Sequence, residues 1–184
     1  MLAEFPVFPR LRAHDFSALP ADGQRYEILA GDLAVSPVPS IVHQRTLARV
    51  WAALVPLEAD GVGQVVLGPV AVVLNPETVV QPDLVVVQAD RTALITPSHV
   101  AGAPDLIVEV VSAQTRTRDL RIKAPLYCRA SVLEYWVVDP LAQVVIQHQL
   151  TDTQYVVARY GPGETLTTAL DPDRPIAVAD CFSD

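Results

Sequence analysis

The sequence has few cysteines and no long hydrophobic run, and both shortages exclude whole classes of protein. Its two cysteines, Cys128 and Cys181, lie far apart without CxxC spacing, so neither a disulfide framework nor a zinc site is predicted. Gly, Pro, Asn, Gln or a charged residue interrupts every apolar stretch before it reaches the roughly 18 residues of a membrane helix. The N-terminal residues contain two early prolines and no continuous apolar segment, unlike a secretion signal. We therefore expect a cytoplasmic protein with no membrane partner.

Lysine is also scarce, and positive charge is outweighed by negative charge. Twelve arginines and a single lysine, Lys123, stand against 21 acidic residues and give a formal net charge of −8. Proteins that depend on nonspecific contacts with nucleic-acid phosphates normally carry the opposite sign. A nucleic-acid function would therefore need a local basic patch. Five basic residues do gather in one short segment: Arg116, Arg118, Arg121, Lys123 and Arg129.

The length and composition predict one folded domain over residues 1–184, with an irregular N-terminal arm over about residues 1–20. Hydrophobic residues make up 51% of the 184 residues, which excludes a disordered chain. Hydrophobic patterning predicts strands at 26–29, 33–36, 64–67, 70–74, 84–87, 106–111, 134–138, 144–149 and 155–159. It also predicts a helix from an N-cap at Ser40 to near Pro56, and a second over 119–130 that Pro125 should distort. This order indicates an α/β or α+β fold, a mixed β-sheet core flanked by a few helices.

Two acidic residues stand out because they accompany apolar strands. Asp83 opens the strand 84–87, and Glu109 lies inside the strand 106–111. An ionised carboxylate buried in an apolar run needs a cation, hydrogen bonds or a raised pKa. A salt bridge to a nearby arginine would satisfy Glu109, and so would a metal ion. With Asp83 on a neighbouring strand, the pair could hold Mg²⁺ or Mn²⁺ through oxygen and so support phosphodiester hydrolysis.

Lys123 invites a functional interpretation because every other basic residue is an arginine. An ammonium group beside the metal could orient the attacking water and offset charge on phosphorus. Arginine cannot supply the same compact, titratable point charge. The alternative is a solvated lysine on the surface of a helix.

Three segments, 26–44, 79–87 and 102–140, resemble a large bacterial restriction-endonuclease family within the PD-(D/E)XK nuclease superfamily. The resemblance runs over roughly residues 12–160 and implies a restriction-endonuclease-like fold with Mg²⁺-dependent hydrolysis of DNA. Asp83 matches the family's PD aspartate and Glu109 its second acid, and the backbone carbonyl of Val110 would be a further metal ligand. The resemblance also implies that the catalytic lysine lies on the following helix, at Lys123. The strand position where the superfamily usually has its lysine is occupied here by Val111.

The resemblance implies roles for further polar residues, each with a structural alternative. Glu27 matches an acid that completes the metal shell, although an arginine-paired strand carboxylate would look the same. His43 and Gln44 match a polar pair on the first helix, although His43 also fits a hydrogen-bonded core histidine. A final group would face the nucleic acid or else form a solvated basic surface: Arg116, Arg118 and Arg121.

These observations lead to one function and two alternatives. The first is a Mg²⁺- or Mn²⁺-dependent endonuclease that cuts DNA as a homodimer, with Asp83, Glu109, Lys123 and Glu27 as its catalytic residues. The second is a nuclease-fold protein that has lost cleavage and serves as a binding or assembly module, which the net charge of −8 favours. The third is hydrolysis of a small phosphodiester or nucleotide, which needs no extended basic surface.

Overall fold

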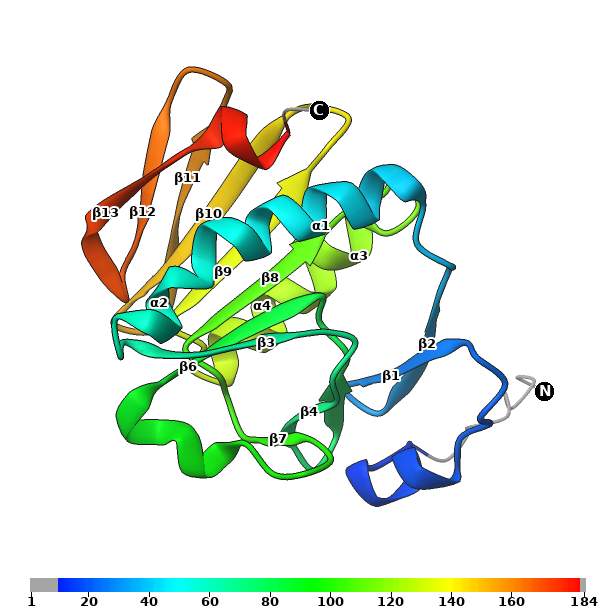
Figure 1. Cartoon of the computed structure of the whole chain (residues 1–184). Coiled ribbons are helices and arrows are strands. Elements are labelled where there is room, and N and C mark those ends of the chain that lie inside the picture. Colours follow the sequence, from blue (N-terminus) through cyan, green and yellow to red (C-terminus); the bar gives the residue numbers. More distant parts are fainter. Residues whose placement is uncertain (1–9, 183–184) are drawn as a thin grey trace.

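The computed structural model describes residues 10–182, whose strands form sheets of six, five and two strands (Figure 1). The strands are β1 (Arg25–Leu29), β2 (Asp32–Ser36), β3 (Gly63–Leu67), β4 (Val72–Asn75), β5 (Thr78–Val80), β6 (Leu84–Gln88), β7 (Val100–Ala101), β8 (Leu106–Val110), β9 (Glu134–Asp139), β10 (Val144–Thr151), β11 (Gln154–Tyr160), β12 (Thr165–Thr168) and β13 (Asp171–Ala177). The large sheet has the order β11-β10-β9-β8-β6-β3, and the five-stranded sheet has the order β2-β1-β5-β4-β7. Both are mixed, because β8 pairs with β9 and β4 with β7 in parallel.

The helices are few and mostly short. They are α1 (Ile41–Leu54), α2 (Pro56–Ala59), α3 (Arg116–Arg118), α4 (Ala124–Arg129), the 3₁₀ helices η1 (Ala13–Ala18), η2 (Ala89–Leu94) and η4 (Val178–Cys181), and the π-helical segment η3 (Asp119–Lys123). Figure 1 shows α1 crossing one face of the six-stranded sheet. No helix in residues 10–182 is long and apolar enough to cross a membrane.

Most of the predicted elements are present. The hairpin of β1 and β2, the N-cap of α1 at Ser40 and the end of α1 before Pro56 are confirmed. The predicted helix over 119–130 begins earlier and is divided, since η3 separates α3 from α4 directly before Pro125. Proline lacks the N–H of a regular helical turn, which explains the distortion there.

Hydrophobic patterning does not predict β5, β7 or the hairpin β12-β13. The first two have only three and two residues, too few to show a periodicity. Strand β13 contains Pro172 and Pro175, which suit a loop or an edge strand better than a central one. The predicted arm over 1–20 is described only from residue 10, and η1 lies within that part. Its first nine residues lie outside the described residues.

The two faces of β8 contact different apolar clusters. Leu106, Val108 and Val110 join the cluster under α1. Ile107, with Val111 just beyond the strand, joins a second cluster formed with α4 and the five-stranded sheet. Alternation along a strand therefore places Glu109 on the second side, as the sequence predicts.

Candidate functional site

Asp83 and Glu109 face each other at the end of β6 and β8. Leu84 pairs with Val108 in this antiparallel ladder, so the preceding Asp83 lies opposite Glu109. The N–H of Val110 donates a hydrogen bond of 2.8 Å to Asp83 Oδ2. Both acids are buried, with 3% of each residue exposed. Two residues 26 positions apart (109 − 83) thus form one acidic pair.

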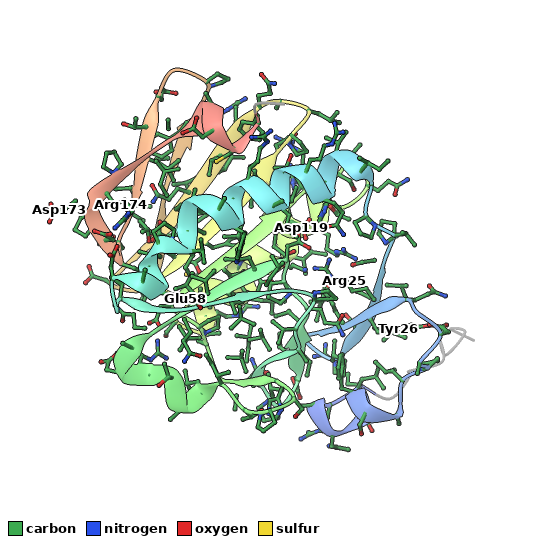
Figure 2. The ribbon with its side chains drawn as sticks, in the orientation of Figure 1. Arg25, Tyr26, Glu58, Asp119, Asp173 and Arg174 are labelled. Carbon is green, nitrogen blue, oxygen red and sulfur yellow. The ribbon has the colours of Figure 1, made fainter. Side chains whose placement is uncertain are left out.

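Arg25 connects the two acids. Its Nη1 lies 2.7 Å from Asp83 Oδ1, and its Nη2 lies 3.5 Å from Glu109 Oε2. Nη2 also donates a hydrogen bond to the carbonyl of Gln81, just before Asp83. The predicted arginine salt bridge to Glu109 is therefore present, and the same guanidinium serves Asp83. Figure 2 labels Arg25 together with Asp119, which lines the same cavity.

Lys123 is buried on the other side of Glu109. Its Nζ lies 2.7 Å from Glu109 Oε1 and 2.7 Å from Glu27 Oε1, with Asp119 Oδ1 at 3.7 Å. Tyr127 donates a hydrogen bond of 2.9 Å to the same Glu109 oxygen. The predicted pairing of Glu27 with an arginine is present, since Arg118 Nη2 lies 4.0 Å from Glu27 Oε2, but Lys123 is the nearer partner. The solvated-lysine alternative is wrong, since Lys123 is 1% exposed.

His43 belongs to the site through Asp83. It lies in the first turn of α1, and its Nε2 is 3.1 Å from Asp83 Oδ2. The N-cap serine of that helix, Ser40, accepts a hydrogen bond from the His43 N–H, which fixes the start of the turn. The neighbouring Gln44 is exposed and lines a second cavity, on whose wall Asp83 also lies.

Their surroundings separate the pKa values of the two acids. Burial alone would raise the pKa of Asp83, but the hydrogen bond from His43 and the charge of Arg25 lower it to about 2. Burial raises the pKa of Glu109 to about 8, and the nearby Asp83 adds to this effect while Lys123 opposes it. Divergent pKa values in neighbouring carboxylates are typical of functional sites.

A cavity of about 370 Å³ opens over the acidic pair. Asp83, Glu109 and Arg25 form part of its wall, whereas Lys123 does not line it. Its rim is largely apolar and includes exposed side chains such as Val38 and Leu141. A ligand entering this cavity would therefore meet the two carboxylates before it met Lys123.

The donor set fits a hard divalent cation. Asp83 and Glu109 offer carboxylate oxygens, which Mg²⁺ and Mn²⁺ prefer. The Val110 N–H points to Asp83. Since the N–H and C=O of a strand residue project to the same side of the strand, the Val110 carbonyl is also directed toward the side of Asp83. The guanidinium of Arg25 between the acids shows that they hold positive charge. No group of three or more His, Cys, Asp or Glu side chains within residues 10–182 is arranged to hold a metal ion, so backbone and water oxygens would complete the shell.

Comparison with known proteins shows the family and the fold of the chain. The model of the Uma2 family, described as "Putative restriction endonuclease", matches residues 13–178. The chain belongs to this family. A crystal structure of a "putative nuclease belonging to DUF820" from Anabaena variabilis is similar over 94% of this chain and 98% of that chain, with a TM-score of 0.79 and 16% identity. That likeness confirms the predicted fold class. No curated protein sequence matches the chain.

The three arginines predicted to face nucleic acid differ from one another in exposure and in their contacts in this Uma2 protein. Arg118 points inward, donating hydrogen bonds to the Val35 carbonyl and the Ser36 hydroxyl of β2. Arg116 is exposed, and its Nε lies 3.0 Å from Asp139 Oδ2. Arg121 is exposed on η3. Arg118 thus joins α3 to β2, while the other two remain on the surface.

Three polar members of the site, Arg25, Asp119 and Tyr127, were not predicted from the sequence, although their spacing carries a signal. Arg25 shares a strand face with Glu27, two residues later. Asp119, Lys123 and Tyr127 recur every fourth residue, which places them along one side of a helix. These spacings became meaningful only once Glu109 was known to lie against them.

Proposed function

We propose that this Uma2 protein is an endodeoxyribonuclease that depends on Mg²⁺ or Mn²⁺. The observation that carries the proposal is the pairing of Asp83 with Glu109 on adjacent strands at the wall of a cavity, around one shared positive group. Membership of a restriction-endonuclease family supports phosphodiester hydrolysis as the reaction class.

Asp83, Glu109 and the carbonyl of Val110 would hold the cation. When bound, such a cation polarises the phosphoryl oxygen and lowers the pKa of the attacking water. Lys123 and Tyr127 hold Glu109 Oε1 and leave Oε2 on the side of Arg25. His43 Nε2 lies 3.1 Å from Asp83 Oδ2 and holds that oxygen.

This arrangement changes the roles expected for Lys123 and Glu27. The buried ammonium contacts Glu27 and Glu109, so Lys123 is a positioning residue for Glu109 in place of a direct partner of the attacking water. Glu27 binds Lys123 through Oε1 and acts one step further from the cation than expected.

Cleavage of plasmid DNA tests the proposal. The full chain should cut DNA with Mg²⁺ or Mn²⁺, and Asp83→Asn or Glu109→Gln should abolish cutting. Asp105→Asn is a matched control. Asp105 is a buried acid next to β8, but its partner is Arg91 and it does not line the cavity. Cutting by Asp83→Asn at the wild-type rate would refute the assignment.

The alternative function, a non-cleaving binding or assembly module, has one specific observation in its favour. Both acids already have cationic partners in Arg25 and Lys123, as in a structural salt-bridge network. That alternative expects no Mn²⁺ binding and no cleavage. Sedimentation together with DNA binding at several salt concentrations separates the two, since a DNA enzyme should lose affinity steeply as salt rises. The same sedimentation experiment tests the homodimer that double-strand cutting would use.

A further inference from the structure

We propose that Arg25 occupies the metal position in the cation-free protein and leaves it when the divalent cation binds. Arg25 would then set the metal affinity of the site. The inference rests on the proposed function, because it takes Asp83 and Glu109 as the ligands.

The contacts of Arg25 carry the first step. One guanidinium nitrogen lies 2.7 Å from an Asp83 oxygen, and another lies 3.5 Å from a Glu109 oxygen. These oxygens are the ones left free by other partners, since Val110 and His43 contact the second Asp83 oxygen and Lys123 contacts the second Glu109 oxygen. The guanidinium therefore uses the same carboxylate atoms that a shared cation would use.

Simultaneous occupancy is disfavoured by distance and by charge. A hard cation lies roughly 2.0 to 2.6 Å from its carboxylate oxygens. Its centre would then fall within the space of a guanidinium that contacts the same two oxygens. Two positive groups this close in a partly buried site repel each other strongly. Binding of the cation therefore requires Arg25 to move.

The surroundings of Arg25 give it a place to move. A second cavity, of about 390 Å³, lies against Arg25 and Asp83 and is also lined by Gly68 and Pro69. Arg25 lines both cavities, and 19% of its side chain is exposed. Its bond to the Gln81 carbonyl, outside the carboxylate pair, gives the displaced side chain a remaining anchor.

Mn²⁺ titration of the full chain, by calorimetry and by electron paramagnetic resonance of free Mn²⁺, tests the exchange without an activity assay. Arg25→Gln should bind Mn²⁺ at least about tenfold more tightly than the wild type, because the competing charge is gone. Arg91→Gln is the matched control, since Arg91 also pairs with a buried acid, Asp105, but outside the site. It should leave the Mn²⁺ affinity unchanged.

A competition experiment tests the same exchange in the reverse direction. In Arg25→Ala, free guanidinium ion at concentrations below those that unfold the protein should weaken Mn²⁺ binding competitively. The wild type, which carries its own guanidinium, should show a much smaller effect. Circular dichroism establishes that each variant is folded, and Arg25→Lys replaces any variant that is not. Arg25→Lys should also bind Mn²⁺ more tightly than the wild type, because one ammonium group cannot bridge both acids as a guanidinium does.

The outcomes separate this inference from the proposed function. Tighter Mn²⁺ binding by the Arg25 variants supports both. Equal or weaker binding by the variants, with clear binding by the wild type, overturns the exchange and leaves the metal site intact. Failure of the wild type and of every Arg25 variant to bind Mn²⁺ overturns both.

Discussion

Lys123 Nζ and Glu109 Oε1 lie 2.7 Å apart in the interior, and the same ammonium also holds Glu27 Oε1 at 2.7 Å. The contact joins η3 to β8 and, through Glu27, to β1. It fixes one oxygen of Glu109 and so determines which oxygen remains for a ligand in the cavity. A buried charge with these partners is expected to matter for folding as well as for the site.

Lys123→Met should lower the free energy of unfolding by about 3–5 kcal/mol, because it removes the ammonium that lies 2.7 Å from each of two buried carboxylates. Urea unfolding followed by circular dichroism measures the loss. Glu27→Gln combined with Lys123→Met should recover part of it, since one of the stranded charges is removed. A loss no larger than that of an exposed lysine would contradict the buried network.

Tyr127→Phe should cost about 1 kcal/mol of stability and also weaken Mn²⁺ binding, because Glu109 loses a hydrogen-bond donor. Tyr155→Phe provides the comparison, as the Tyr155 hydroxyl donates a bond of 3.0 Å to the Val132 carbonyl, away from the cavity. It should change stability alone. Equal effects of the two variants on Mn²⁺ affinity would argue against a role for Tyr127 in positioning Glu109.

Gly68→Ala should displace Asp83. The Gly68 N–H donates a bond of 2.7 Å to the Asp83 carbonyl, and an added Cβ would meet the carbonyl oxygens of Pro82 and Asp83. Overpacking of this kind typically costs about 1–3 kcal/mol. We expect lower stability and weaker Mn²⁺ binding, measured by urea unfolding and calorimetry. Gly161→Ala, where a Cβ makes only ordinary contact, should behave like the wild type.

His148 should make stability depend on pH. Its ring lies between Tyr135 and Tyr155, with centroids 5.2 and 5.5 Å away, and burial lowers its pKa below 6.5. The unfolded chain then binds the proton more readily, so the contribution of His148 is present above pH 6.5 and is lost as the pH falls below that value. Urea unfolding at about pH 7.5 and about pH 5.5 should show a larger acid loss for wild type than for His148→Gln. His14→Gln, at an exposed histidine, should leave the loss unchanged.

The acidic pair was predictable because strand alternation and the prolines that mark strand boundaries can be recognised in the sequence. Glu109 interrupts an apolar strand, and Asp83 follows a proline at the start of another. The sequence therefore predicts a buried acid at Glu109 and places Asp83 at the start of a neighbouring strand. The partner of Glu27 was not predictable in the same way, since a buried carboxylate accepts either an arginine or a lysine, and only distance selects between them.

The sequence by itself determined the mixed sheet, the first helix, the break at Pro125 and the two faces of β8, because each depends on periodicity or backbone chemistry within a short segment. Tertiary structure alone decided that Arg25 lies between Asp83 and Glu109, that Lys123 is enclosed by two glutamates, and that Arg118 points inward. These contacts join residues between 14 and 96 positions apart (123 − 109 and 123 − 27). Their geometry follows from how β1, β6, β8 and η3 pack together, which no local pattern encodes.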